Sequence, residues 1–310
     1  MIDTRKAAMV AVLAAVALAM AGPAHAQKTI KMLYTAVNGF ASAYVAQDEG
    51  FFHKHGFDVE FTLTQSSGNH PAALVSDSVQ IGGPTMTTVL QANDAGLDLV
   101  VFAGGAVYPL DGDILVARQG SGIKKTADLK GKRIGVPGLG ALLHVMLVRN
   151  LKLQGVDPDS VKFVEIAFPQ AGDALKSGTI DAYPAVAPFS ARIVQSGAGY
   201  EVEDWLKETP DGTLTVIYAA TRKWATANRD VIEGFKAGMA EANEFVKTHQ
   251  DTEVKAIAHY TKLPDKIVAS LAPPNLIVDV TPQQVKFWID ISREQGLIKG
   301  NPDPASVIFK

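Results

Sequence analysis

Apolar and polar residues alternate along the chain in a pattern that predicts strands and helices in turn. Short apolar runs predict strands at 30–34, 57–61, 79–82, 99–102, 114–117, 133–136, 161–166 and 180–183. Stretches between them predict helices at 41–49, 71–76, 85–95, 140–153, 170–176 and 189–196. Strands that alternate with helices of this length are typical of a parallel sheet with helices on both faces. The pattern therefore predicts an α/β fold.

From about Thr221 onward the pattern becomes helical. Apolar residues three and four positions apart form one stripe from Val231 to Val246, which indicates a helix packed on the core. The stretch 281–284 (Thr-Pro-Gln-Gln) has the form of a capping box with proline at the first helical position. Gly296 is a plausible stop for the helix that begins there.

The first 26 residues have the features of a cleavable export signal. Arg5 and Lys6 precede an apolar run from Ala7 to Ala21, and the small residues 24–26 (Ala-His-Ala) provide a cleavage site. The apolar run is too short to span a bilayer, which needs about 20 residues. We therefore expect cleavage after residue 26 and a soluble mature protein in the periplasm.

Composition narrows the classes of function. The chain has 310 residues, is 47% hydrophobic and contains no cysteine. These values exclude intrinsic disorder, disulfides and thiolate metal sites. A formal net charge of −3 provides no basic field for nucleic acid. We expect no nucleic-acid partner, no cofactor and no metal, and we expect a monomer.

Signatures of catalysis are missing from the sequence. It has no G-x-S-x-G elbow, no H-E-x-x-H pair and no P-loop. The loop 135–140 follows a strand and is rich in glycine, but Leu143 stands where a dinucleotide loop needs its third glycine. We therefore expect a binding protein rather than an enzyme.

Loops that follow the predicted strands carry the candidate ligand-binding residues. Ligands of open α/β sheets bind beyond the carboxyl ends of the strands, where small residues and hydroxyls leave backbone amides free. The candidates at these positions are Tyr34, Asn38, Gly39, Ser66, Ser67, Gly83, Thr85, Tyr108, Gly140, Ala141, Leu142, His144, Phe168 and Tyr183.

Within this set we expect the anion anchor at the helix that begins near Gly140. The first amides of that helix (Gly140, Ala141 and Leu142) would bind the anionic group, because a helix N-terminus carries free donors and a partial positive charge. Ser66 and Ser67 would donate hydroxyls from the opposite side. His144 either packs in the helix or faces the ligand, and Tyr34, Tyr108 and Phe168 either stack on the ligand or belong to the core.

Four stretches of the sequence resemble a known family. They are 50–60 (GFFHKHGFDVE), 128–136 (DLKGKRIGV), 174–182 (ALKSGTIDA) and 188–189 (PF). They are similar to periplasmic substrate-binding proteins of ABC importers, in the nitrate/sulfonate/taurine group that also includes thiamine-precursor binders. The resemblance covers the whole mature chain.

The resemblance implies a type II periplasmic binding protein fold, with two doubly wound lobes, a ligand cleft between them and a helical C-terminal region. Lobe 1 would cover 27–112 and lobe 2 would cover 113–212, with a return to lobe 1 over 213–310. The crossing segments would lie near 111–117 and 211–218. The implied partners are a small organic anion and a membrane permease driven by a separate ATPase.

Two departures from the family pattern bear on the ligand. Ala187 stands where the family often has glutamate, and the family's sulfonate binders often carry Ser or Thr where this chain has Ala141, Leu142 and Leu143. The second departure argues against aliphatic sulfonates and favours a small organic anion, a carboxylate or sulfonate, with an apolar or aromatic body. The alternatives are a pyrimidine-precursor binder or a related enzyme, and a ligand sensor for a membrane kinase.

Overall fold

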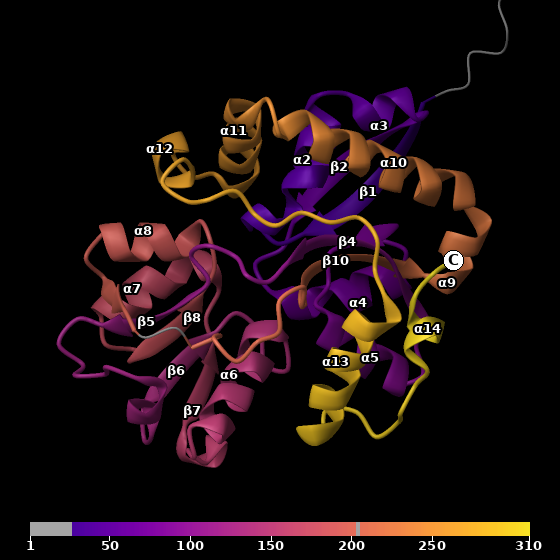
Figure 1. The fold of residues 1–310 in the computed structure, drawn as a ribbon. Helices are drawn as coiled ribbons and strands as arrows, with labels where there is room; N and C mark the ends of the chain where they lie inside the picture. Colours follow the sequence, from indigo (N-terminus) through magenta and orange to yellow (C-terminus); the bar gives the residue numbers. More distant parts are fainter. Residues whose placement is uncertain (1–26, 203–204) are drawn as a thin grey trace, which may run out of the picture.

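The computed structural model describes residues 27–202 and 205–310. Its strands form two five-stranded sheets, each at the centre of one lobe (Figure 1). The sheet of lobe 1 has the order β2-β1-β3-β10-β4, and the sheet of lobe 2 has the order β7-β6-β8-β5-β9. The predicted leader, residues 1–26, lies outside the described residues.

The strands of lobe 1 are β1 (Lys28–Tyr34), β2 (Phe57–Leu63), β3 (Ile81–Gly82), β4 (Leu99–Val107) and β10 (Leu214–Thr221). Those of lobe 2 are β5 (Ile114–Arg118), β6 (Arg133–Val136), β7 (Lys162–Glu165), β8 (Ala182–Ala185) and β9 (Gly199–Glu201).

Helices cover both sheets. Those of lobe 1 are α2 (Ala41–Asp48), α3 (Phe51–Lys54), α4 (His70–Val75), α5 (Met86–Asp94), α9 (Arg222–Ala227), α10 (Arg229–Val246), α11 (Gln250–Thr261), α12 (Asp265–Val268), α13 (Pro282–Glu294) and α14 (Pro304–Val307). Those of lobe 2 are α6 (Leu142–Leu153), α7 (Ala171–Lys176) and α8 (Phe189–Gln195). The α/β prediction is confirmed, and so is the helical C-terminal region. No helix in the described part of the chain is long and apolar enough to cross a bilayer.

One strand in each sheet corrects the expectation of a purely parallel sheet. β10 runs antiparallel to both β3 and β4, and β5 runs antiparallel to both β8 and β9. Each is the first strand that the chain forms after it crosses from one lobe to the other. The connections span 108–113 and 202–213, because Ile114 and Leu214 already begin strands.

Local sequence signals account for the C-terminal helices. The Thr281 hydroxyl accepts from the Gln284 amide and the Gln284 side chain accepts from the Thr281 amide, which is the predicted capping box at the start of α13. The stripe of α10, including Phe235 and Met239, is buried against lobe 1. Gly296 follows the end of α13 with a positive φ of 69°, as a helix stop requires.

The segment 272–275, between α12 and α13, forms hydrogen bonds with the first connection and with the end of β4. The Ala272 amide donates to the Asp111 carboxylate, and the Asn275 side chain donates to the Pro109 carbonyl. The Val107 amide in turn donates to the Asn275 carbonyl. The first connection between the lobes is therefore hydrogen-bonded to a segment from the C-terminal part of the chain.

Candidate functional site

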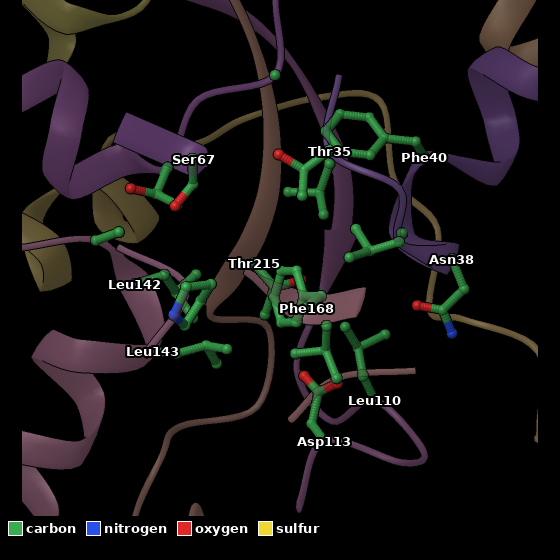
Figure 2. Close-up of a pocket in the computed structure, with 18 of the residues that line it drawn as sticks. Thr35, Asn38, Phe40, Ser67, Leu110, Asp113, Leu142, Leu143, Phe168 and Thr215 are labelled. Atoms are coloured by element: carbon green, nitrogen blue, oxygen red, sulfur yellow. The ribbon is translucent and has the colours of Figure 1, made fainter. Parts of the chain in front are cut away.

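A cavity lies between the two lobes, beside the first connection (Figure 2). It holds about 640 Å³ of empty space, counting space open to solvent. Loops after β1, β2 and β3, the start of β10, the first connection and loops of lobe 2 all contribute to its wall. The lining residues are Thr35, Val37, Asn38, Gly39, Phe40, Ser67, Gly83, Pro84, Thr85, Leu110, Asp113, Pro137, Ala141, Leu142, Leu143, Phe168, Val186, Thr215 and Val216.

The cavity brings together eight of the residues expected from sequence. Asn38, Gly39, Ser67, Gly83, Thr85, Ala141, Leu142 and Phe168 all line it. Tyr34, Ser66, Tyr108, Gly140, His144 and Tyr183 are not among the lining residues. The ends of the strands therefore do converge, but not every side chain there faces the cavity.

The N-terminus of α6 faces the cavity. Its N-cap residue, Ala141, is extended and has no capping side chain. Within the described residues, the amides of Leu142 and Leu143 have no hydrogen-bond acceptor. Both residues line the cavity, so these free donors and the positive end of α6 are available to a ligand.

Two of the three expected anchor amides are used within the protein itself. The Gly140 amide donates to His144 Nδ1 at 2.9 Å, and the Ala141 amide donates to the Gly138 carbonyl at 3.2 Å. Of the three amides expected to bind an anion, only that of Leu142 is therefore free, together with the amide of Leu143 that follows it. His144 is turned onto its own loop, and its ring packs edge-on against Phe163. Burial lowers its pKa.

Ser67 and Ser66 have different roles. The Ser67 hydroxyl is buried, lines the cavity and has no hydrogen-bond partner among the described residues. The Ser66 hydroxyl accepts from the Gly68 amide at 3.3 Å and caps the short helix 67–69. Of the two serines, only Ser67 therefore places its hydroxyl where it could donate to a ligand in the cavity.

The two glycines that line the cavity are required for packing. A Cβ on Gly83 would lie 2.2 Å from Phe40 Cζ, and a Cβ on Gly39 would lie 2.5 Å from Val216 Cγ2. Thr85 lines the cavity as the N-cap of α5, accepting from the Thr88 amide. These residues shape the wall by keeping the backbone close to its neighbours.

Of the three aromatic residues expected either to stack on the ligand or to belong to the core, Phe168 lines the cavity and Tyr34 and Tyr108 do not. Phe168 lines the cavity, stacked on Phe189 with ring centroids 5.6 Å apart. Tyr34 and Tyr183 are core residues whose hydroxyls donate to the Tyr260 and Ile166 carbonyls. Tyr34 ends β1 and Tyr183 lies within β8, and the alternation of side chains along each strand directs both rings into the core.

Sequence reasoning missed Asp113, which lies in the first connection. Its carboxylate accepts from the Ala187 amide, yet its Oδ1 is buried without a partner among the described residues. Burial raises the pKa of this carboxyl to about 8. A carboxylate beside a flexible glycine, Gly112, inside an expected crossing segment is the signal that could have identified it.

Basic side chains lie at a neighbouring hollow rather than in the cavity. No lysine or arginine is among the cavity's lining residues, all of which are described. The adjoining hollow shares Thr35 and Phe168 with the cavity and is lined by Arg192 and Lys262. Two basic side chains therefore lie beside the cavity, while its lining offers hydroxyls, amides, apolar side chains and the Asp113 carboxyl.

Direct hydrogen bonds join the lobes around the cavity. Gln91 of α5 donates to the Gly140 carbonyl at 2.9 Å, and the Asn38 amide donates to the Ala187 carbonyl at 3.3 Å. Gln295, after α13, donates to the Val145 carbonyl of α6 at 2.8 Å. These contacts tie lobe 2 to lobe 1 at three places.

A family model and several curated proteins match this chain. The model described as "NMT1/THI5 like" matches residues 38–253. A putative aliphatic sulfonates-binding protein of Escherichia coli is 29% identical over 213 residues, which cover 67% of this chain and 65% of that protein. The taurine-binding periplasmic protein of Escherichia coli is 26% identical over 253 residues, covering 78% of this chain and 76% of that one.

Solved structures share the fold. The alkanesulfonate-binding protein SsuA from Xanthomonas axonopodis pv. citri, bound to MOPS, has a TM-score of 0.77 at 20% identity, covering 91% of this chain and 98% of its own. The periplasmic nitrate-binding protein NrtA from Synechocystis PCC 6803 has a TM-score of 0.77 at 14% identity, covering 90% and 84%. The type II binding-protein fold expected from sequence is confirmed by these matches.

Proposed function

The chain belongs to the NMT1/THI5-like family, and on this premise we propose that it is the solute-binding component of an ABC importer, acting in the periplasm. It makes and breaks no covalent bond. Its ligand is a small organic anion, a carboxylate or sulfonate with an apolar body. A membrane permease with a separate ATPase would receive the ligand, and the leader at 1–26 would direct export.

The cavity between the lobes is the observation that carries this proposal. Its polar donors are the free amides of Leu142 and Leu143 and the unpartnered Ser67 hydroxyl, which come from opposite lobes. An anion held by both would link the lobes. Around these donors Phe168, Leu110 and Val216 offer apolar surface, which suits a ligand whose remaining atoms are hydrocarbon.

The relatives support an anionic ligand. The curated and solved proteins that match this chain are described as binding sulfonates, taurine or nitrate, all of which carry an anionic group. The two cations at the adjoining hollow, Arg192 and Lys262, would draw such a ligand toward the cavity from solution.

We propose that the protein captures its ligand by closing the two lobes around it. Contacts that form only when the lobes meet give the closed arrangement a higher affinity, and a ligand can shift the equilibrium only by that difference. The first connection, 108–113, and the described residues 205–213 of the second would bend as the lobes close. We keep the lobe boundaries 27–112, 113–212 and 213–310, and the monomeric state, as parts of this proposal.

A panel of small anions tests the proposed ligand class. Short-chain carboxylates and alkanesulfonates should raise the melting temperature of the protein, because a ligand that binds only the native state stabilises it. Uncharged alcohols of the same chain length serve as controls and should cause no shift. If the alcohols raise the melting temperature as much as the anions do, the ligand is not recognised by its charge.

A matched pair of serine variants tests the anchor. Ser67→Ala should weaken the best anion of the panel by about 10-fold, since it removes a hydrogen bond to a charged group. Ser66→Ala should change the affinity by less than about 2-fold, because Ser66 caps its own loop and does not line the cavity. Titration calorimetry on both variants measures these affinities. Equal affinities for Ser67→Ala and the unchanged protein would remove Ser67 from the site.

A further inference from the structure

Asp113 places a carboxylate in a cavity whose other polar groups suit an anion. The residue lies at the end of the first connection and lines the cavity wall. In Figure 2, Ser67 and Leu142 lie on the left of the cavity, Phe168 lies near its centre and Asp113 lies at its lower edge. The carboxylate is therefore set apart from the expected anion anchor.

The fold supplies a hydrogen-bond partner to the Asp113 carboxyl but leaves its Oδ1 without one. The group accepts from the Ala187 amide, which fastens the connection to the loop before α8. Its Oδ1 remains buried with no partner among the described residues. A buried acceptor without a partner destabilises the fold, so buried polar atoms of this kind are rare and call for an explanation.

The surroundings of Asp113 supply no cation to balance it. Leu110, Val186 and Leu143 line the same cavity, no lysine or arginine is among the described lining residues, and Asp111 adds a like charge nearby. In the ligand-free protein burial keeps this carboxyl protonated up to about pH 8, and a donor within the cavity would pair with Oδ1 and allow the group to ionise. A simple alkyl anion would place hydrocarbon against Oδ1 and leave it unsatisfied.

We propose that Asp113 Oδ1 accepts a hydrogen bond from an N–H group of the ligand, which is therefore an organic acid with an N–H donor at the end away from its anionic group. The inference rests on the proposed function and adds a second recognition point to it. The donor is either a protonated amine or a neutral amide, since both present N–H to an acceptor. Asp113 would then reject acids that end in hydrocarbon, because they leave its oxygen without a partner.

Matched acids test this inference on the unchanged protein. Butanoate has no donor, 4-aminobutanoate carries an ammonium and succinamate carries a neutral amide at nearly the same place. Propane-1-sulfonate and 3-aminopropane-1-sulfonate provide the corresponding pair of sulfonates. We expect at least one donor-bearing acid to bind about 10-fold more tightly than its donor-free partner in titration calorimetry.

Variants at Asp113 identify the donor. Asp113→Ala removes the acceptor and should abolish the preference in either case. Asp113→Asn keeps an acceptor oxygen but removes the charge, so it should abolish a preference for the ammonium and keep a preference for the amide. Asp111→Asn is the matched control. It changes an aspartate that binds the Ala272 amide outside the cavity and should leave the preference intact.

The outcomes separate this inference from the proposed function. If donor-free acids bind as tightly as donor-bearing ones, or if Asp113→Ala keeps the preference, the inference is wrong while the anion-binding function stands. If no acid binds at all, the proposed function fails and the inference fails with it. If Asp113→Ala does not fold, the inference is still tested by the preference of the unchanged protein and by the effect of Asp113→Asn on that preference.

Discussion

Raising the pH from 5 to 8 is expected to lower the free energy of unfolding of the ligand-free protein by about 2–4 kcal/mol. Burial raises the pKa of Asp113 to about 8 and that of Glu253 to about 7. In the unfolded chain both carboxyls lose their protons near pH 4. Between these values the folded state holds protons that the unfolded state has released, so stability falls as the pH rises through 7 and 8.

A buried histidine acts in the opposite direction at lower pH. Burial lowers the pKa of His70 to about 3, so the folded state keeps this ring neutral while the unfolded chain protonates it below about pH 6.5. Its contribution to stability is lost as the pH falls from 6.5 toward 3. The steepest loss of stability on raising the pH is therefore expected above pH 6.5, where His70 is neutral in both states.

Chemical denaturation at pH 5, 6.5 and 8 measures this dependence. Asp113→Asn and Glu253→Gln should each flatten the profile, because each removes one group that must ionise within the fold. Asp111→Asn should flatten the profile less than Asp113→Asn does, because repulsion from Asp111 raises the pKa of Asp113 less than burial does. A profile of the unchanged protein that is flat between pH 6.5 and 8 would contradict the expectation.

Replacing Gly138 by leucine is expected to lower ligand affinity by at least about 30-fold while leaving the ligand-free melting temperature within about 2 °C. Gly138 belongs to lobe 2, and a Cβ there would lie 2.9 Å from Ser67 Oγ of lobe 1. A leucine has no room when the lobes meet, but it has room when they are apart. A change of 30-fold corresponds to about 2 kcal/mol in the cost of closure.

Calorimetry and small-angle scattering check this effect together. The unchanged protein should contract when a saturating anion is added, whereas Gly138→Leu should keep its larger radius of gyration. Gly68→Leu is the matched control, because the nearest atom to a Cβ at Gly68 is Ser66 Oγ at 3.6 Å. If Gly138→Leu binds and contracts normally, closure does not bring these two loops together as it does in this structure.

The sequence predicts most strands of the fold because their apolar runs are short and bounded by turns. It misses β10, where Leu214–Thr221 leads directly into helical sequence and offers no break between strand and helix. It places β8 two residues early, because Pro184 argues against a strand that the structure nevertheless pairs with Leu115. The antiparallel direction of β5 and β10 depends on pairing with strands far away in the sequence, and a local pattern of apolar residues does not reveal it.

The candidate site was predictable as a region but not as a set of contacts. Strand ends and glycine-rich loops indicate where the cavity lies, as Asn38, Ser67 and Phe168 show. Local hydrogen bonds then decide which groups remain free. Nothing in the sequence reveals that Gly140 is already bonded to His144, or that Ser66 rather than Ser67 caps its loop.

The position of β10 has a consequence for the order in which the lobes can fold. All five strands of lobe 2 come from one continuous stretch, Ile114 to Glu201, so its sheet can form as soon as that stretch is available. The sheet of lobe 1 has β10 between β3 and β4, and β10 is not complete until Thr221. A chain released from its N-terminus onward would therefore complete its second lobe first. The sheet of the first lobe would remain incomplete, with the facing edges of β3 and β4 unpaired, until β10 becomes available more than 100 residues after β4.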